Sequence, residues 1–272
     1  MIFRVPFFLF VLLPVMIVII PVQAVINALK LPCWGVLPRF FHRLGCIFLG
    51  LRVTVIGKPE TGRATLLVSN HVSWTDIVAV GSVAEVTFVA KREVNDWFFV
   101  GMMARLQKTI FVDRTRRSDA GRTAQEMGAR MASGNAVLLF AEGQSDIGTH
   151  VLPFRSALVG AAQHAMIEAG ATDVLIQPLT IAYTKLQGLP VSRNERSMIA
   201  WVKSKSMGQN IREILSGPVK DVTVAFGAPR LLRETDNRKV VTKSAEDDVR
   251  TMLVALNRGQ PLPVLADQSL QV

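Results

Sequence analysis

A histidine and an aspartate five residues apart are the clearest candidates for chemistry in the sequence. His71 and Asp76 lie in the segment NHVSWTD, directly after Thr65–Ser69, a run typical of a buried strand. On one continuous helix their side chains would point about 140° apart and could not meet. They can meet if His71 lies in a turn and Asp76 in the first turn of a helix. His71 could then take a proton from an alcohol, while Asp76 orients the imidazole and stabilises the imidazolium.

A purely structural interpretation of these residues stays open. Ser73 and Asp76 also fit a helix-capping pattern, with Ser73 as the N-cap. A histidine at the end of a strand is often a hydrogen-bonded core residue. A catalytic role for His71 and Asp76 is favoured because ligands bind at the carboxyl ends of strands in α/β sheets. The sequence contains no G-x-S-x-G and no cysteine in a catalytic-type motif, which favours direct base catalysis over an acyl-enzyme.

The elements that must position this pair alternate between short β-branched runs and helical stretches. The predicted strands are Arg52–Ile56, Thr65–Ser69, Val86–Ala90, Thr109–Val112, Ala136–Phe140, Val174–Tyr183 and Val219–Phe226. The predicted helices are Trp74–Ala84, Ser118–Ala132, Leu158–Ala169 and Ala245–Leu256. This alternation predicts an α/β fold with a mixed, largely parallel sheet flanked by helices. We place the catalytic domain at residues 51–258, an N-terminal membrane-anchoring segment at 1–50 and a loose tail at 259–272.

The N-terminal segment predicts association with a membrane. Every residue from Val5 to Val22 is apolar or proline, which is long enough to span a bilayer core of roughly 20 helical residues. Three prolines leave a kinked or re-entrant helix open, and the small residues near Ala24 leave a cleaved signal peptide open. Positive charge concentrates after the segment, at Lys30, Arg39 and Arg43. This predicts an inner (cytoplasmic) membrane protein whose catalytic domain faces the cytoplasm.

Two further apolar stretches allow two interpretations each. Val36–Leu51 mixes aromatic and aliphatic residues with cations, which suits an amphipathic helix on the membrane surface or a helix that faces the core. Trp97–Met103 could contact lipid or acyl chains, or could be an ordinary core helix.

Composition narrows the class of partner. The chain has 272 residues, of which 50% are hydrophobic, so a folded core is expected and wholesale disorder is excluded. Its net charge of +10 points to an anionic partner. The sequence lacks zinc-finger spacing and an aromatic RNA-binding motif, which favours a lipid surface over nucleic acid. The two cysteines, Cys33 and Cys46, form neither a metal cluster nor a disulfide framework, as expected in a reducing cytosol.

Four ordered blocks between Asn70 and Leu179 resemble the motifs of the glycerolipid acyltransferase superfamily, which includes the 1-acyl-sn-glycerol-3-phosphate acyltransferases. NHVSWTD looks like its H-x4-D motif. The other three blocks are Phe111–Arg114, Phe140–Gly143 and Val174–Leu179. The resemblance implies that Arg114 helps to bind the acceptor's phosphate and that Glu142 and Gly143 shape the acceptor site. It also implies that the fourth block, a strand ending in proline, lies near the acyl donor.

The third block departs from the family pattern F-P-E-G-T-R-S. Ala141, Gln144 and Ser145 stand where the pattern has proline, threonine and arginine. The missing arginine removes one expected phosphate ligand and puts the acceptor in doubt. The continuation from Gly148 resembles a bacterial branch that includes lyso-ornithine lipid O-acyltransferases, and we hypothesise that Arg155 replaces the missing cation.

These observations predict a membrane-bound acyltransferase. The resemblance implies transfer of a fatty-acyl group from acyl-CoA or acyl carrier protein to the free sn-2 hydroxyl of 1-acylglycerol-3-phosphate, giving phosphatidate. A lyso-ornithine lipid O-acyltransferase and an inactive membrane-bound lipid-binding protein are the alternatives. A serine-type lipid hydrolase is disfavoured because the nucleophile elbow is lacking. We expect no metal or organic cofactor beyond the donor's carrier. The expected partners are a lysophospholipid acceptor, the acyl donor and membrane lipid.

Overall fold

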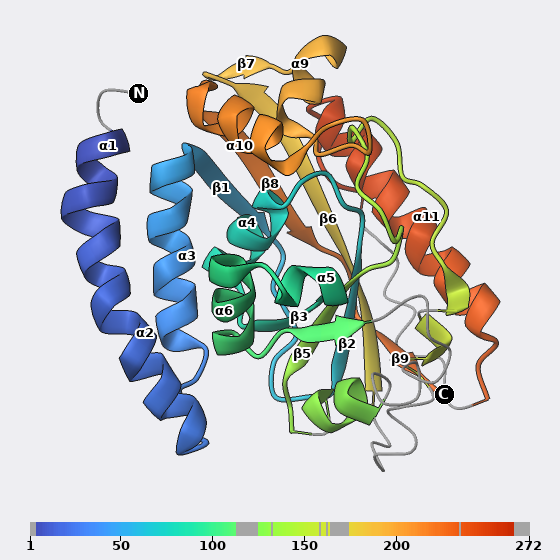
Figure 1. Cartoon of the computed structure of the whole chain (residues 1–272). Helices are drawn as coiled ribbons and strands as arrows, with labels where there is room; N and C mark the ends of the chain where they lie inside the picture. The colour runs from blue at the N-terminus through green and yellow to red at the C-terminus, as the bar shows by residue number, and fades with distance from the viewer. Residues whose placement is uncertain are drawn as a thin grey trace.

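The computed structural model describes residues 4–112, 125–131, 133–157, 159–161, 163, 174–233 and 235–263. Its centre is a nine-stranded sheet in the order β1-β8-β6-β2-β5-β3-β4, with β7 and β9 also paired to β6 (Figure 1). The strands are β1 (Leu51–Ile56), β2 (Thr65–Ser69), β3 (Val86–Lys91), β4 (Ile110–Val112), β5 (Ala136–Phe140), β6 (Val174–Leu186), β7 (Leu189–Pro190), β8 (Lys220–Phe226) and β9 (Arg230–Leu232).

Parallel pairing brings the carboxyl ends of the central strands to one edge of the sheet. β2 pairs parallel with both β5 and β6, and β3 pairs parallel with β5 and β4. β6 is antiparallel to β7, β8 and β9, so the sheet is mixed and largely parallel, as predicted. Ser69 is the register partner of Phe140, so the residues that follow β2 and β5 emerge side by side.

Helices cover both faces of the sheet. Alternate residues of β2 point to opposite faces: Leu67 packs in one core cluster and Leu66 in the other. The first cluster includes residues of α3 (Val36–Leu49), α4 (Thr75–Val83) and α10 (Met207–Ser216). The second includes residues of α11 (Arg238–Asn257) and of the helical residues 125–131. Figure 1 shows α4 and α11 on opposite sides of the strands.

Most predicted elements are present, with some different bounds. β6 continues to Leu186, three residues past the predicted end, because β8 goes on pairing with it beyond an irregularity at Tyr183 and Lys185. α11 begins at Arg238 rather than Ala245, capped by Asn237, whose side chain accepts a hydrogen bond from the Lys239 N–H. Its exposed, charged first turns carry no apolar periodicity that could reveal them.

The other predicted helices are only partly described. Within Ser118–Ala132, residues 125–131 are helical, and within Leu158–Ala169, residues 159–161 and 163 are helical. The remaining residues of both ranges lie outside the described part of the chain. The prediction missed α9 (Arg193–Ile199) and α10, whose N-caps are Ser192 and Ser206.

The N-terminal helical segment is present and largely uncovered. It consists of α1 (Arg4–Phe7), the π-helical turn η1 (Phe8–Leu12) and α2 (Leu13–Ala28). Together they form a 25-residue helix that is apolar and long enough to cross a membrane, and only 6% of its most apolar window is buried. Figure 1 shows it beside α3, away from the sheet. The predicted boundaries at residues 50 and 258 stay predictions.

The two ambiguous apolar stretches each show both characters. α3 buries His42, Cys46 and Leu49, whereas Phe40 and Ile47 on the same helix are exposed. Trp97–Met103 becomes most of α6 (Phe98–Leu106), which follows the short α5 (Arg92–Asn95). Gly101 of α6 is buried, but Phe98 is 92% exposed, so α6 is not an ordinary core helix.

Candidate active site

His71 lies in the turn that follows β2, and Asp76 lies in the first turn of α4. Nδ1 of His71 is 2.8 Å from Oδ2 of Asp76. This is the arrangement in which residues at this spacing can meet. The tight turn is fixed at its start by Asn70, whose side-chain amide donates to the carbonyl of Ile181 on β6 and accepts from its N–H, both at 2.9 Å.

The Asp76 carboxylate is fully buried and has four donors. Oδ2 accepts from the N–H of Val72 at 2.7 Å and that of Ser73 at 3.0 Å, as well as from His71. Oδ1 accepts from the hydroxyl of Tyr183 at 2.8 Å. These bonds satisfy the buried carboxylate and fix its direction, so Asp76 holds Nδ1–H of His71 and leaves Nε2 as the basic nitrogen.

The capping interpretation is only half right. Asp76 does accept from the backbone of Ser73, but the Ser73 hydroxyl is buried without a hydrogen-bond partner, and α4 begins at Thr75 with Trp74 as N-cap. The carboxylate therefore organises the turn around His71 rather than completing a capping box.

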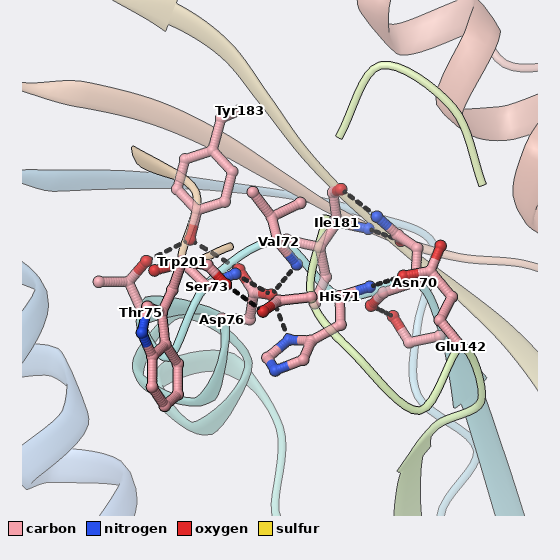
Figure 2. A network of polar contacts seen from close by, with 12 residues as sticks. Asn70, His71, Val72, Ser73, Thr75, Asp76, Glu142, Ile181, Tyr183 and Trp201 are labelled. Atoms are coloured by element: carbon pink, nitrogen blue, oxygen red, sulfur yellow. Dashed lines mark hydrogen bonds and ion pairs between the residues drawn. The ribbon is translucent and has the colours of Figure 1, made fainter. Parts of the chain in front are cut away.

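The imidazole is held on one face and open at its free nitrogen. Its ring stacks on Phe140 with centroids 4.0 Å apart and planes 19° apart. The side chain remains 17% exposed. Figure 2 shows Nδ1 directed at the carboxylate and the second ring nitrogen directed away from the network. An acceptor hydroxyl could therefore reach Nε2 while the ring stays in place.

Glu142 follows the carboxyl end of β5 and supports the backbone of His71. Its Oε2 accepts from the N–H of His71 at 2.8 Å and its Oε1 from that of Leu152 at 2.8 Å. The residue is 3% exposed, and burial raises the pKa of the Glu142 carboxyl to about 8. Both oxygens accept from the protein's own amides, so Glu142 fixes the turn around His71, and its role in shaping the acceptor site stays a prediction.

Gly143 and Arg155 are brought together beside this carboxylate. Gly143 has a φ of +71°, and a Cβ there would lie 2.6 Å from Nε of Arg155, so the guanidinium stem crosses the glycine. The Arg155 N–H donates to the carbonyl of Ala141 at 2.9 Å. Arg155 is exposed, so its charge is available to a ligand near the turn that Glu142 anchors. Its role in binding stays a prediction.

The residues around Ser145 close a loop over the histidine turn. The Ser145 hydroxyl donates to the carbonyl of Trp201, and the Trp201 N–H donates to the carbonyl of Val72 at 3.0 Å. The Asp146 N–H donates to the carbonyl of His71 at 2.9 Å. Where the family pattern has an arginine, this chain therefore has a serine that fixes one loop against another.

Arg114, the residue expected to bind the acceptor's phosphate, lies outside the described residues. His42 is buried, and its Nε2 lies 2.8 Å from Oε1 of Gln107, as expected of a structural histidine. His150 lies 3.0 Å from the Thr149 hydroxyl, and His164 is outside the described residues.

Tyr183 and Thr75 are the site residues that sequence analysis missed. The Thr75 hydroxyl lies 2.6 Å from the Tyr183 hydroxyl and can donate to it, since Tyr183 donates to Asp76. A signal was present: Tyr183 is the chain's single tyrosine and ends the apolar predicted strand Val174–Tyr183, where a buried hydroxyl would need a partner.

Comparisons with known proteins agree with this geometry. The model of the family described as Acyltransferase matches residues 52–182, which include His71, Asp76 and Glu142. The lyso-ornithine lipid O-acyltransferase of Brucella abortus is 40% identical over 245 residues, 90% of this chain and 92% of that protein. That of Rhizobium meliloti is 37% identical over 92% of this chain and 85% of that protein. The chain therefore belongs to the acyltransferase family within the glycerolipid acyltransferase superfamily.

A solved structure shares the fold. The 1-acyl-sn-glycerophosphate (LPA) acyltransferase PlsC from Thermotoga maritima superposes with a TM-score of 0.57 at 20% identity, covering 80% of this chain and 77% of that one. At this identity the likeness establishes the fold, a mixed sheet flanked by helices.

Proposed function

We propose that the chain is a membrane-associated O-acyltransferase that moves a fatty-acyl group from a thioester donor to the hydroxyl of a lyso-ornithine lipid. The observation that carries the reaction is the His71–Asp76 pair, 2.8 Å apart, with a partly exposed imidazole at the carboxyl edge of the sheet. Lysophosphatidate, the acceptor first expected from the motifs, becomes the second candidate.

The chemistry needs a base and two aligned substrates. Nε2 of His71 takes the proton of the acceptor hydroxyl while the hydroxyl oxygen attacks the carbonyl carbon of the thioester. The C–S bond then breaks, and the imidazolium returns its proton to the leaving thiolate. Asp76 stabilises the imidazolium in between, and the stacking on Phe140 holds the ring in the attack geometry. Acyl-CoA and acyl carrier protein both supply such a thioester.

The acceptor proposal rests on the third block and on the relatives. The ornithine head group has a carboxylate and an ammonium rather than a phosphate, so its binding site needs fewer cationic side chains. Ser145 bonds to Trp201 where the family pattern has an arginine, while the exposed Arg155 beside Gly143 supplies one cation suited to one carboxylate. The 40% identity over nine-tenths of the chain to a lyso-ornithine lipid O-acyltransferase supports the same acceptor.

Lysophosphatidate is favoured by a different observation. The fold is shared with the Thermotoga maritima LPA acyltransferase, and Arg114 keeps the motif position expected to bind phosphate. If Arg114 and Arg155 both reached the head group, each guanidinium could bind the phosphate through two hydrogen bonds.

A panel of acceptors separates the candidates. The full chain in membranes is supplied with acyl-CoA or acyl carrier protein and with lyso-ornithine lipid or lysophosphatidate, and kcat/KM is compared. We expect the higher value with lyso-ornithine lipid. A higher value with lysophosphatidate would establish the second candidate, and no product from any pair would support an inactive lipid-binding protein.

Arg155→Ala tests the head-group contact. We expect KM for lyso-ornithine lipid to rise about 10- to 100-fold, because a hydrogen bond to a charged group contributes about 1.5–3 kcal/mol, with kcat nearly unchanged. Arg63→Ala is the matched control, because Arg63 is exposed and lies before β2, at the opposite edge of the sheet. An unchanged KM in Arg155→Ala would remove Arg155 from the acceptor site.

A further inference from the structure

A cavity with several charged lining residues lies at the edge of the sheet opposite His71. Its volume is about 770 Å³, and Thr109 and Asn135, which precede β4 and β5, are among its lining residues. His71 and Glu142 follow the other ends of the parallel strands β2 and β5. The length of β5 puts the two places roughly 20 Å apart at about 3.3 Å per residue. The cavity is therefore separate from the catalytic site.

The lining of this cavity carries an excess of positive charge. Its cations are Lys30, Arg105, Lys108 and Arg130, and among the described lining residues Glu126 is the one carboxylate. Glu126 pairs with Arg130 at 4.0 Å, whereas Arg105 donates to the carbonyl and side-chain oxygens of Asn95. Nζ of Lys108 lies 4.8 Å from the centre of the Trp34 ring. Burial and the nearby Arg130 lower the pKa of Lys108, a repulsion that a bound anion would offset.

Two of these lysines occupy backbone positions that glycine would occupy more easily. Lys30 has a φ of 52° and Lys108 a φ of 59°, just after the C-caps of α2 and α6. The left-handed region is strained for a residue with a Cβ, and glycine is the usual residue there. A cation near a helix C-terminus does favour the helix dipole, but any position in the last turn serves that purpose. The placement of both lysines at the cavity is thus not explained by helix capping alone.

The cavity walls are fixed and apolar residues flank them. Nδ2 of Asn27 donates to the carbonyl of Leu106 at 2.8 Å and Nε2 of Gln23 to the same carbonyl at 3.3 Å, which ties α2 to the end of α6. Nε2 of Gln23 also donates to the carbonyl of Trp34 at 2.8 Å. Leu29, at the end of α2, is 64% exposed, and Phe98 starts α6 only three residues after the lining residue Asn95. An amphiphile could bury its head group among the cations and lay its chains on these apolar side chains.

We propose that this cavity binds the phosphate-containing head group of an anionic membrane lipid, as a second lipid site independent of the acyl acceptor. The cations supply the charge-assisted hydrogen bonds that a phosphate takes, and the exposed apolar ends of α2 and α6 favour a lipid over a free anion. The site would hold the N-terminal helix and the domain at the same membrane surface.

Binding to vesicles tests the site on the full chain. Vesicles of phosphatidylcholine alone are compared with vesicles that also contain phosphatidylglycerol, using the wild type, Lys30→Gly/Lys108→Gly and the control Lys185→Gln/Lys239→Gln. The control removes the same charge from exposed lysines outside the cavity lining. We expect the glycine variant to lose about 30-fold in affinity for the anionic vesicles, since each cation near the surface contributes about 1 kcal/mol. Its melting temperature should be unchanged or higher, because glycine relieves the backbone strain.

Three outcomes of this experiment would each overturn the proposal. Equal losses in the glycine variant and the control would show diffuse attraction rather than a site. A wild type without preference for phosphatidylglycerol would show that no such lipid is bound. Protection of the wild type against thermal unfolding by inorganic phosphate, with the vesicle preference unchanged between the wild type and the glycine variant, would assign the cavity to a free anion.

Discussion

At the scale of single residues, the buried carboxyl groups of Asp76 and Glu142 together hold His71 in place. Asp76 bonds the ring nitrogen and the two backbone amides that follow His71, and Glu142 bonds the backbone amide of His71 itself. The ring and the main chain of His71 are therefore fixed by different groups, one in helix α4 and one in the loop that follows β5. Such double support is what a base needs to stay within reach of a substrate hydroxyl.

Glu142 should make stability depend on pH. Burial raises the pKa of the folded Glu142 carboxyl to about 8 from its ordinary value of 4.5, so the folded state holds the proton more strongly than the unfolded state. This contribution is full below the unfolded pKa and is lost as pH rises through the folded one. In Glu142→Gln we expect a constant cost of about 1 kcal/mol from one lost hydrogen bond, and no loss of stability between about pH 5 and pH 8 from this group.

Thermal melting of both proteins across that range checks this. The melting temperature of the wild type should fall towards that of Glu142→Gln, or below it, as pH rises. Melting curves whose separation stays the same at every pH would show that Glu142 titrates in its ordinary range.

The residue scale also shows where sequence reasoning succeeds and fails. The contact between His71 and Asp76 follows from local spacing and from their place after a strand, so the sequence predicts it. The roles of Glu142 and Tyr183 depend on residues about 70 and 107 positions away, brought near by sheet pairing. Motif position implied that Glu142 shapes the acceptor site, but it could not reveal that both of its oxygens accept from backbone N–H groups.

At the scale of elements, the packing of α3 on α4 sets the position of Asp76. Gly81 of α4 faces His42 of α3, and a Cβ on Gly81 would lie 2.5 Å from Cδ2 of that ring. The ring has little room to move, because it is buried and hydrogen-bonded to Gln107. The absence of a side chain at position 81 lets the two helices approach.

Gly81→Ala should therefore push the helices apart. We expect a loss of about 1–3 kcal/mol in the free energy of unfolding, the usual cost of overpacking. Denaturant unfolding measures it, with Gly208→Ala as the control, because a Cβ at Gly208 in α10 meets no atom within 4 Å. The control should be neutral or gain less than about 1 kcal/mol. Equal effects of the two substitutions would mean that α3 and α4 are not closely packed at Gly81.

Strands and helices also differ in how well the sequence predicts them. The central strands are runs of buried β-branched and aliphatic residues, and their bounds are recovered closely from the sequence. The prediction missed α9 because this helix is short and largely polar, although Ser192 and Glu195 form a capping box at its start. α10 does carry an apolar periodicity, with Met207, Ile211 and Ile214 on one face, and this signal was not used.

At the scale of the whole molecule, the exposed face of the N-terminal helix is its most unusual surface. Ile17, Val18 and Val25 on α2 are more than half exposed, although such residues are normally buried. They give the N-terminal helix an apolar side that water would not favour. We expect this side to contact the membrane and to bring the site to its lipid substrate.

A single charge on that face should release the protein from membranes. Ile17→Asp and the control Val240→Asp replace aliphatic residues that are both 66% exposed, one on α2 and one on α11. A charge inside the bilayer costs about 2.5–3.5 kcal/mol, so we expect Ile17→Asp to weaken membrane binding about 100-fold. Sedimentation of membranes after an alkaline wash measures the bound fraction. Wild-type retention of Ile17→Asp would show that α2 is not the anchor.

The most direct test of the account is formation of ornithine lipid by the wild type and by His71→Ala. Purified membranes containing each protein are supplied with lyso-ornithine lipid and a labelled acyl thioester, and the product is quantified, with matched melting temperatures as the control for folding. We predict product with the wild type and a loss of about 10²–10⁴-fold in kcat with the variant, the usual contribution of a general base. Turnover by His71→Ala at the wild-type rate would contradict the assignment of His71 as the base.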